Sequence, residues 1–346
     1  AIDRTPVQPR PSKKPPMPLP KISFACSLYD RMMPLYLREV QVEGFDVDFE
    51  GSHGATSVRA IFDKMGAQGK AFDVSEMSGS EFISARAKGD DRYVGIPVFP
   101  SRAFRSSYIF VNRRTVSRPE DLTGKRIGVP LFTMSAAVIA RGFLADEYGF
   151  DYDACTWVQG NMFEAGKHGN AAPPAMARPP RKLVETQGKS LSAMLGAGEI
   201  DATVGPFIPD CYRKNPDVVR LFPDYRAVEL AYYRNTRVFP IMHVIVIRRS
   251  VHEAHPTLAQ SLFDALSRSK AIALARMKDV ASLEYMLPWL AHDVEEIDEV
   301  FDGDPWPYGL ERNRPTLEAQ TRYLWEQGLT ERKMPVDEIF LQVKEG

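Results

Sequence analysis

The sequence predicts an α/β protein of two lobes, each a mostly parallel sheet covered by helices, with two hinge strands joining the lobes. Strand and helix patterns alternate from Lys21 to Pro100, and the alternation starts again near Arg113. Two apolar strands, Tyr108 to Asn112 and Val238 to Ile247, stand where the chain would enter and leave the second lobe. Repeated alternation of this kind favours parallel sheets with helices packed on them. A ligand would lie between the lobes, near the carboxyl ends of strands and the N-termini of helices.

The predicted division of the chain is a flexible, proline-rich arm over 1–20, a discontinuous first lobe over 21–110 and 240–346, and a second lobe over 111–239. A chain of 346 residues is long enough for two domains. The arm, AIDRTPVQPRPSKKPPMPLP, is rich in proline and basic residues, which is typical of extended or disordered segments.

In the first lobe, we expect strands at KISFACS from Lys21, at Val40 to Phe49 with a turn at Gly44, in FDV ending at Val74, and at GIPVFP. The segment SVRAIFDKMGAQG has a helical pattern. The cluster of serine and glycine after Val74 is expected to open another helix, because small polar residues favour helix starts.

In the second lobe, RPEDL predicts a helical turn, and a strand from Arg126 to Val129 follows it. The next helix is expected to start at Thr133 or Ser135 and to end before Gly149. CTWVQG predicts a strand, NMFEAGKHGNAAPPAMARPPR a long loop, and LSAMLGAGEIDATVGPF a helix, a turn and a strand.

The chain returns to the first lobe at the end of the segment RLFPDYRAVELAYYRNTRVFPIMHVIVIRR, through the long apolar strand Val238 to Ile247. Everything after Ser250 is expected to be helical except the loop PWPYGLERN. The aromatic stretches PWPYGL and YLWEQGL are candidates for a homo-oligomer interface, although aromatic residues in such stretches more often belong to the core.

The composition excludes several classes of protein. Lys and Arg number 44 against 45 Asp and Glu, so the net charge of −1 argues against a nucleic-acid partner. No apolar run approaches the ~20 residues of a membrane span. Three widely spaced cysteines, Cys26, Cys155 and Cys211, form neither a disulfide framework nor a zinc motif, which favours the cytoplasm. The chain begins at Ala1 rather than Met, so a removed signal peptide and a periplasmic location stay open.

The usual cofactor and enzyme motifs are absent from the sequence. It contains no glycine-rich dinucleotide or phosphate-binding motif, no HExxH and no GxSxG. We therefore expect no cofactor and no metal.

A cationic pair in FPSRAFR predicts a site for an anionic small molecule. Arg102 and Arg105 lie in a segment that leads into the strand at Tyr108. Guanidinium groups match a carboxylate in two-point fashion and stay charged at any working pH. Ordinary surface salt bridges are the alternative explanation of this pair.

Two serine-rich segments where helices are predicted to open are further candidates for binding carboxylates. Ser75, Ser78 and Ser80 stand in SEMSGSEF, and Thr133 and Ser135 stand in LFTMSAA. Free backbone N–H groups at a helix start attract anions. These hydroxyls are equally well explained as helix caps.

Two titratable residues are candidates for acid–base chemistry. His243 stands in an apolar strand close to the predicted hinge, and a core histidine with a satisfied hydrogen bond is the alternative. Glu76 is expected at the carboxyl end of a strand, as a general acid or base or as a charge at a helix N-terminus. Tyr29, Asp30 and Arg31 follow the first strand and could reach the same crevice, whereas the other histidines stand in polar or helical segments and look solvated.

Taken together, YDR, FDVSEMS, IPVFPSRAFR, DLTGKRIGVP, FPIMHVIVIRR, DPWPYGLERN and WEQGL closely resemble the 4,5-dihydroxyphthalate decarboxylase family. The resemblance runs from about Lys21 to Phe340, with the motifs in one order. It implies the type II periplasmic-binding-protein fold. It also implies loss of CO2 from 4,5-dihydroxyphthalate to give 3,4-dihydroxybenzoate, a step of phthalate degradation.

The resemblance implies a substrate that is a small aromatic dicarboxylate. Under this hypothesis Arg102 and Arg105 clamp the retained carboxylate, with Arg141 assisting, and His243 or Glu76 exchanges the proton. The family's FRHS stands here as FRSS, so Ser106 replaces a histidine. The alternative to an enzyme is a non-catalytic solute-binding protein for an aromatic or other carboxylate, because the same fold serves both.

Overall fold

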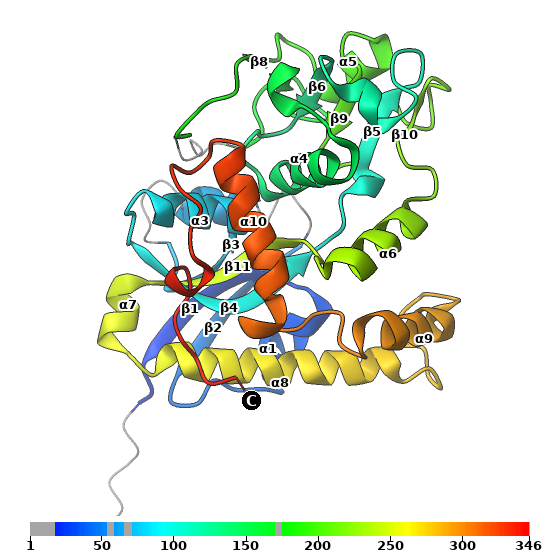
Figure 1. Cartoon of the computed structure of the whole chain (residues 1–346). Helices are drawn as coiled ribbons and strands as arrows, with labels where there is room; N and C mark the ends of the chain where they lie inside the picture. The colour runs from blue at the N-terminus through cyan, green and yellow to red at the C-terminus, as the bar shows by residue number, and fades with distance from the viewer. Residues whose placement is uncertain (1–17, 54–58, 66–70, 170–174, 346) are drawn as a thin grey trace, which may run out of the picture.

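The chain forms two mixed, mostly parallel sheets, seen one above the other in Figure 1. The computed structural model describes residues 18–53, 59–65, 71–169 and 175–345. The first sheet has the order β2-β1-β3-β11-β4 and the second the order β10-β5-β9-β6-β7-β8. These two sheets bear out the predicted α/β fold class with two lobes.

The first sheet contains one strand that runs against the others, and this strand is contributed late in the sequence. β11 pairs antiparallel with both β3 and β4, whereas β1 pairs parallel with β2 and β3. The strands are β1 (Lys21–Ser27), β2 (Asp46–Ser52), β3 (Val74–Ser78), β4 (Tyr93–Arg102) and β11 (Ile241–Arg248).

The second sheet also contains one strand that runs against its neighbours, and this strand is β5, next to the edge strand β10. β5 pairs antiparallel with β9 and β10, and β6 pairs parallel with β7 and β9. The strands are β5 (Ile109–Asn112), β6 (Arg126–Val129), β7 (Thr156–Gln159), β8 (Leu183–Glu185), β9 (Ala202–Val204) and β10 (Val218–Arg220).

Helices cover the sheets, and one of them reaches from the first sheet to the second. In Figure 1, α8 lies beneath the first sheet and α10 runs upward from it to α4. The helices are α1 (Met33–Tyr36), α3 (Gly79–Ala87), α4 (Ser135–Tyr148), α5 (Leu191–Ala197), α6 (Tyr225–Thr236), α7 (Arg249–Ala254), α8 (Leu258–Lys278), α9 (Leu290–Phe301) and α10 (Arg314–Glu326).

The chain passes between the sheets twice, over 103–108 and over 237–240. Each predicted hinge strand therefore lies within one sheet, β5 in the second and β11 in the first. The two sheets are linked by the short connections that precede these strands. The proposed lobe boundaries at 110–111 and 239–240 and the arm at 1–20 stay predictions. Most of that arm lies outside the described residues.

Two of the predicted elements are wrong, and one helix was not predicted. The strand expected over Val40 to Phe49 is limited to Asp46–Ser52, after the turn at Gly44. The strand expected to end at Val74 begins there instead, because β3 is buried on both faces and its polar side chains find partners inside the protein. The stretch before the strand predicted at Val238 contains a helix that the sequence analysis did not predict, α6, whose start is capped by Asp224 accepting from the Ala227 N–H.

The C-terminal region is less helical than predicted. Residues 279–289 connect α8 to α9 without a helix, and 327–345 hold one short 3-10 turn. The predicted interface stretches belong largely to the core, since Tyr308, Leu310, Tyr323 and Leu324 are buried, whereas Trp325 is half exposed.

Candidate functional site

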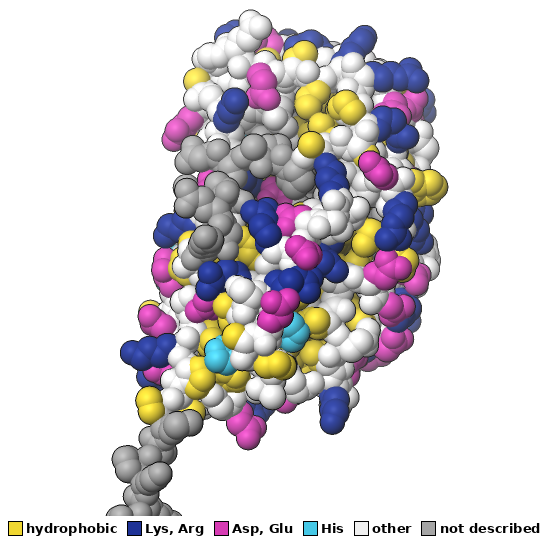
Figure 2. All heavy atoms as spheres, turned by 90° about the vertical axis from the view of Figure 1, so that its left-hand side faces the viewer, with side chains coloured by type: hydrophobic (Ala, Val, Ile, Leu, Met, Phe, Trp, Pro, Cys, Tyr) yellow, Lys and Arg dark blue, Asp and Glu magenta, His cyan; other side chains and the backbone are white. Residues whose placement is uncertain are grey.

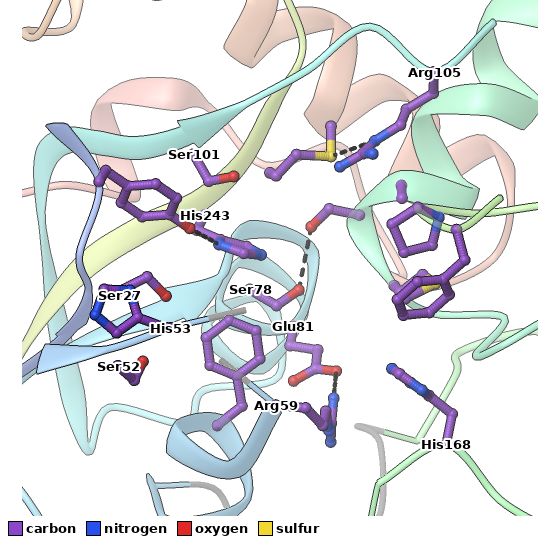
Figure 3. Close-up of a pocket in the computed structure, with 18 of the residues that line it drawn as sticks. Ser27, Ser52, His53, Arg59, Ser78, Glu81, Ser101, Arg105, His168 and His243 are labelled. Carbon is purple, nitrogen blue, oxygen red and sulfur yellow. Dashed lines mark hydrogen bonds and ion pairs between the residues drawn. The ribbon is translucent and has the colours of Figure 1, made fainter. Parts of the chain in front are cut away.

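A cavity of about 360 Å³ opens where the two sheets meet. Its wall comes from the ends of β1, β2, β3 and β4, from β11, and from the start of α4 (Figure 3). The described residues that line it are Ser27, Leu28, Tyr29, Ser52, His53, Arg59, Phe62, Ser78, Glu81, Ser101, Arg105, Met134, Ser135, Ala136, His168, Pro206, Phe207, Met242 and His243.

A buried carboxylate holds the histidine in the wall of this cavity. Glu76 and His243 come from the paired strands β3 and β11, and Glu76 Oε1 lies 2.5 Å from His243 Nδ1. The Tyr29 hydroxyl donates to the same oxygen at 2.7 Å, and the Ser27 N–H donates to Oε2 at 2.9 Å. Because a carboxylate only accepts, Nδ1 carries a proton, and Nε2 is the ring nitrogen left for a ligand.

Glu76 is ionised although it has no exposed surface. Burial alone raises the pKa of this carboxyl, but the neighbouring His243 and the hydrogen bonds from His243, Ser27 and Tyr29 lower it to about 2. Burial and the charge of Glu76 raise the pKa of Tyr29, so this hydroxyl keeps its proton and remains a donor. The structure therefore gives Glu76 a partner that the sequence did not indicate, and places it within β3 rather than at its end.

Arg105 is the cation that faces the cavity without a carboxylate partner among the described residues. Its Nε donates to the sulfur of Met242 at 3.2 Å, and its guanidinium lies 5.2 Å from the centre of the Tyr108 ring. Burial lowers its pKa to about 10, so the side chain keeps its charge at neutral pH. In Figure 3 it lies across the cavity from Ser27 and Ser52, with His243 between.

The serines at the starts of α3 and α4 bond to one another across the junction of the sheets. The Ser80 hydroxyl donates to the Thr133 carbonyl at 2.7 Å, and the Ser80 N–H donates to Ser135 Oγ at 3.0 Å. Ser78 Oγ lies 3.2 Å from Ser135 Oγ. Ser78 and Ser135 line the cavity, whereas Ser80 and Thr133 are buried behind it.

Besides Ser80 and Thr133, four more of the predicted binding residues do not line the cavity. Arg102 is buried and donates to the Phe239 carbonyl at 2.9 Å. Arg141 is fully buried, stacks on Phe132 and donates to Gln327 at 2.7 Å. The remaining two are Arg31, whose donors go to Asp30 and the Pro100 carbonyl, and Ser75, whose hydroxyl donates to the Glu76 carbonyl.

Arg102 and Arg141, predicted to clamp a carboxylate, therefore lie outside the cavity, where carbonyl and amide oxygens of the protein accept from some of their donors. Arg31 lies between the rings of Tyr29 and Trp306, at 4.4 Å and 4.3 Å from their centres. Its role is to support the Tyr29 side of the wall rather than to face a ligand.

Several lining residues were missed by the sequence analysis. Arg59 forms ion pairs with Asp63 at 2.8 Å and with Glu81 at 3.0 Å, so its charge is compensated. His168 is half-buried rather than solvated, and burial lowers its pKa, helped by Arg59. Phe62 packs edge-on against His243, with 5.0 Å between ring centres. Only the tertiary fold brings these residues together, so no local motif in the sequence marks them.

Ser106, at which the sequence departs from the motif it resembles, lies outside this cavity. Its hydroxyl donates to Glu229, and the Ser107 N–H donates to the same oxygen at 3.2 Å. Burial raises the pKa of Glu229, against the effect of these hydrogen bonds. Glu229 also raises the pKa of Arg105 through its charge, so Ser106 and Glu229 lie near Arg105 but outside the cavity wall.

Other kinds of site find no support in the described part of the chain. None of its helices has the length and apolar character that crossing a bilayer requires. Over residues 18–53, 59–65, 71–169 and 175–345 no group of three His, Cys, Asp or Glu side chains is arranged to hold a metal ion. On the face drawn in Figure 2, basic and acidic side chains are interspersed.

No protein-family model matches the chain. It is 33% identical over 329 residues to the 4,5-dihydroxyphthalate decarboxylase of Comamonas testosteroni, which spans 92% of this chain and 96% of that protein. It is 35% identical over 217 residues to the 4,5-dihydroxyphthalate decarboxylase of Pseudomonas putida, spanning 62% of this chain and 81% of that protein.

Solved structures with a similar course of the chain include two periplasmic sulfonate-binding proteins. The protein SsuA of Methylobacillus flagellatus KT aligns with a TM-score of 0.49 and 15% identity, covering 93% of this chain and 92% of that one. The aliphatic sulphonate-binding protein SsuA of Escherichia coli aligns with a TM-score of 0.47 and 15% identity, covering 94% of each chain.

Proposed function

The chain belongs to the 4,5-dihydroxyphthalate decarboxylase family, and from this premise we propose that it is a carboxy-lyase that converts 4,5-dihydroxyphthalate to 3,4-dihydroxybenzoate and CO2 without a cofactor. The observation that carries the proposal is the ionised Glu76 holding His243 in the cavity wall, with Arg105 on the other side. A proton donor and a cation at two sides of one cavity suit an aromatic acid that must gain a proton and keep one carboxylate.

The chemistry starts from the hydroxyl para to the departing carboxylate. This hydroxyl gives its proton to a water molecule, its electrons flow into the ring, and the ring carbon that bears the carboxylate takes a proton from His243 Nε2. A C–H bond forms and the ring loses its aromaticity. The bond to the carboxylate carbon then breaks, its electron pair restores the ring, CO2 leaves, and the ring oxygen regains a proton.

Glu76 acts through His243 in this scheme, as a positioning residue. The carboxylate fixes the proton on Nδ1 and stabilises the positive charge that the imidazole carries when Nε2 is protonated. After the transfer, water returns a proton to Nε2. General acid catalysis of this kind contributes about 10²–10⁴-fold to a rate.

Arg105 binds the carboxylate that the product retains. The departing carboxylate should have no strong ion pair, because CO2 is neutral and an ion pair lost in the transition state would slow the reaction. The uneven charge of the cavity fits this requirement, since the guanidinium of Arg59 is already paired with Glu81 and Asp63.

Incubation of the purified protein with 4,5-dihydroxyphthalate tests the proposal. We expect equal amounts of CO2 and 3,4-dihydroxybenzoate, followed by gas evolution and by the ultraviolet spectrum of the ring, and less with the 3,4-dihydroxy isomer. Tight binding without release of CO2 would contradict the proposal and favour the solute-binding alternative.

The His243→Gln variant tests the role of the imidazole. We expect kcat to fall by about 10²–10⁴-fold with little change in KM, because the general acid is lost and the carboxylate contact is kept. His252→Gln, in α7 and outside the cavity, is the matched control and should keep the wild-type kcat. An unchanged kcat in His243→Gln would remove the catalytic role.

A further inference from the structure

Two serine hydroxyls at one end of the cavity have no hydrogen-bond partner. Ser27 ends β1 and Ser52 ends β2, and the two residues are opposite each other in the parallel pairing of these strands. Both line the cavity, and neither Oγ has a hydrogen-bond partner among residues 18–53, 59–65, 71–169 and 175–345. Ser27 is 5% exposed, so water does not readily compensate its hydroxyl.

This pair differs from the other serines around the cavity. Ser78 and Ser135 bond to each other, and Ser80 behind them is satisfied by the Thr133 carbonyl. A buried hydroxyl without a partner costs free energy, so proteins rarely keep one without a reason. Two such hydroxyls side by side, at the edge of a cavity, indicate a place where a ligand supplies the missing partners.

The charge around the pair favours a neutral ligand group over a carboxylate. The Ser27 N–H donates to the ionised Glu76, so a buried negative charge lies directly behind this end of the cavity. The nearest guanidinium on the same loop, that of Arg31, gives its donors to Asp30 and to the Pro100 carbonyl. Arg105 lies at the other side of the cavity (Figure 3).

The spacing favours two adjacent hydroxyl groups. Neighbouring strands lie about 4.8 Å apart, so Ser27 and Ser52 present two hydroxyls at roughly that separation. A pair of ortho hydroxyls on one ring can reach both, since each phenol can donate to one serine oxygen and each serine can also donate back.

We infer that Ser27 and Ser52 bind the two ring hydroxyls of the substrate and make the site select dihydroxylated aromatic acids over acids without hydroxyls. This inference rests on the proposed function and adds the orientation of the ring. With the hydroxyls at the serine end, the carboxylates point toward Arg105, and His243 lies between, beside the ring carbons.

Calorimetric titration with two ligands tests the inference, in protein that carries His243→Gln so that the dihydroxy acid is bound but consumed only slowly. The ligands are 4,5-dihydroxyphthalate and phthalate, which has the same carboxylates and no hydroxyl. For Ser27→Ala and for Ser52→Ala we expect an affinity loss on the order of tenfold for the dihydroxy acid, as for one lost hydrogen bond, and no change for phthalate. The double variant should bind the two ligands almost equally.

Ser84→Ala is the matched control, because Ser84 in α3 is also a buried serine whose hydroxyl has no partner, but it does not line the cavity. It should change the affinity for neither ligand. An equal loss for both ligands in the Ser27 and Ser52 variants, or no loss for either, would overturn the inference. If Ser27→Ala does not fold, the Ser52→Ala variant alone decides, because Ser52 lies at the partly exposed end of its strand.

The same titrations separate this inference from the proposed function. If the wild-type protein releases CO2 but the serine variants keep the full preference for the dihydroxy acid, the inference is wrong and the proposed decarboxylase function stands. Wild-type protein that prefers the dihydroxy acid through these serines but releases no CO2 would sink the decarboxylase and leave the binding site. Wild-type protein that binds neither ligand would sink both.

Discussion

Arg105 is the residue on which recognition of the substrate's charge depends. Its guanidinium faces the cavity, and among the described residues it contacts a methionine sulfur and the Tyr108 ring rather than an acid. A charged donor of this kind gains most from a carboxylate, since charge-assisted hydrogen bonds are about twice as strong as neutral ones.

The Arg105→Ala variant should raise KM by roughly ten- to a hundredfold, because a charged hydrogen-bonded contact to a carboxylate contributes about 1.5–3 kcal/mol. kcat should change much less, since the retained carboxylate keeps its charge through the reaction. Steady-state kinetics with Arg105→Lys as the control, which keeps the charge but not the planar fork, measures the effect. A KM equal to that of the wild type would remove Arg105 from the substrate site.

The sequence predicts that both Arg102 and Arg105 bind a ligand, but it does not indicate that only Arg105 faces the cavity. Both stand in FPSRAFR, three residues apart. Arg102 is the last residue of β4 and turns to the Phe239 carbonyl, whereas Arg105 follows the strand and faces the cavity. The direction of a long side chain at a strand end depends on its tertiary neighbours, and the local sequence carries no record of them.

The same limit applies to Glu76 and His243. Their residue types suggested acid–base chemistry, but they are far apart in the sequence and meet only because β11 inserts beside β3. The polar residues after Val74 predict the start of a helix instead of a strand, since a strand buried on both faces is usually apolar. These polar side chains can be buried because they form hydrogen bonds inside the protein, and the hydrophobic pattern therefore does not indicate a strand.

At the scale of elements, α4 and α10 pack at the closest approach that a glycine allows. A Cβ on Gly142 would lie 2.4 Å from the Tyr323 ring. Around this contact, Arg141 donates to Gln327 at 2.7 Å, and the Tyr323 hydroxyl donates to Asp146 at 2.6 Å. The glycine thus lets a helix of the second sheet lie directly on the helix that rises from the first.

Gly142→Ala should lower the free energy of unfolding by about 1–3 kcal/mol, because overpacking outweighs the gain of up to ~1 kcal/mol in helix propensity. Urea unfolding followed by circular dichroism measures the change. Gly196→Ala in α5 is the comparison, since its Cβ would meet Cys211 at a less severe 3.1 Å. Equal effects of the two substitutions would show that the Tyr323 contact is not the cause.

Local signals predicted the elements that have strong caps and clear patterns. β1, β6 and the end of α4 at Gly149 match the prediction, and Gly149 has the positive φ of 64° that favours glycine after a helix. α6 was missed because its flanking apolar residues and aromatics resemble a strand, although Asp224 offered a cap signal.

At the scale of the whole molecule, one apolar core joins the two sheets. It contains Ala25 and Phe99 from the first sheet and Ile127 and Val204 from the second. The Ser80 and Ser135 bonds and the packing of α10 on α4 add polar contacts across the same junction. Opening the sheets as two hinged bodies would break all of these contacts at once.

We therefore expect substrate binding to proceed without a large closure of the lobes. Small-angle X-ray scattering of the protein alone and with saturating 4,5-dihydroxyphthalate should give the same radius of gyration. A smaller radius with the ligand, as in hinged binding proteins that close on their solutes, would contradict this expectation.

The order of the strands also governs when the site comes into being during synthesis. All strands of the second sheet lie before residue 221, whereas β11, which separates β3 from β4, begins only at Ile241. After residue 220 has been synthesised, all strands of the second sheet are present, whereas the first sheet still lacks the strand between β3 and β4. When β11 pairs with β3 and β4, it completes the sheet and brings His243 next to Glu76. The first sheet and its reactive pair are therefore completed in the same late step.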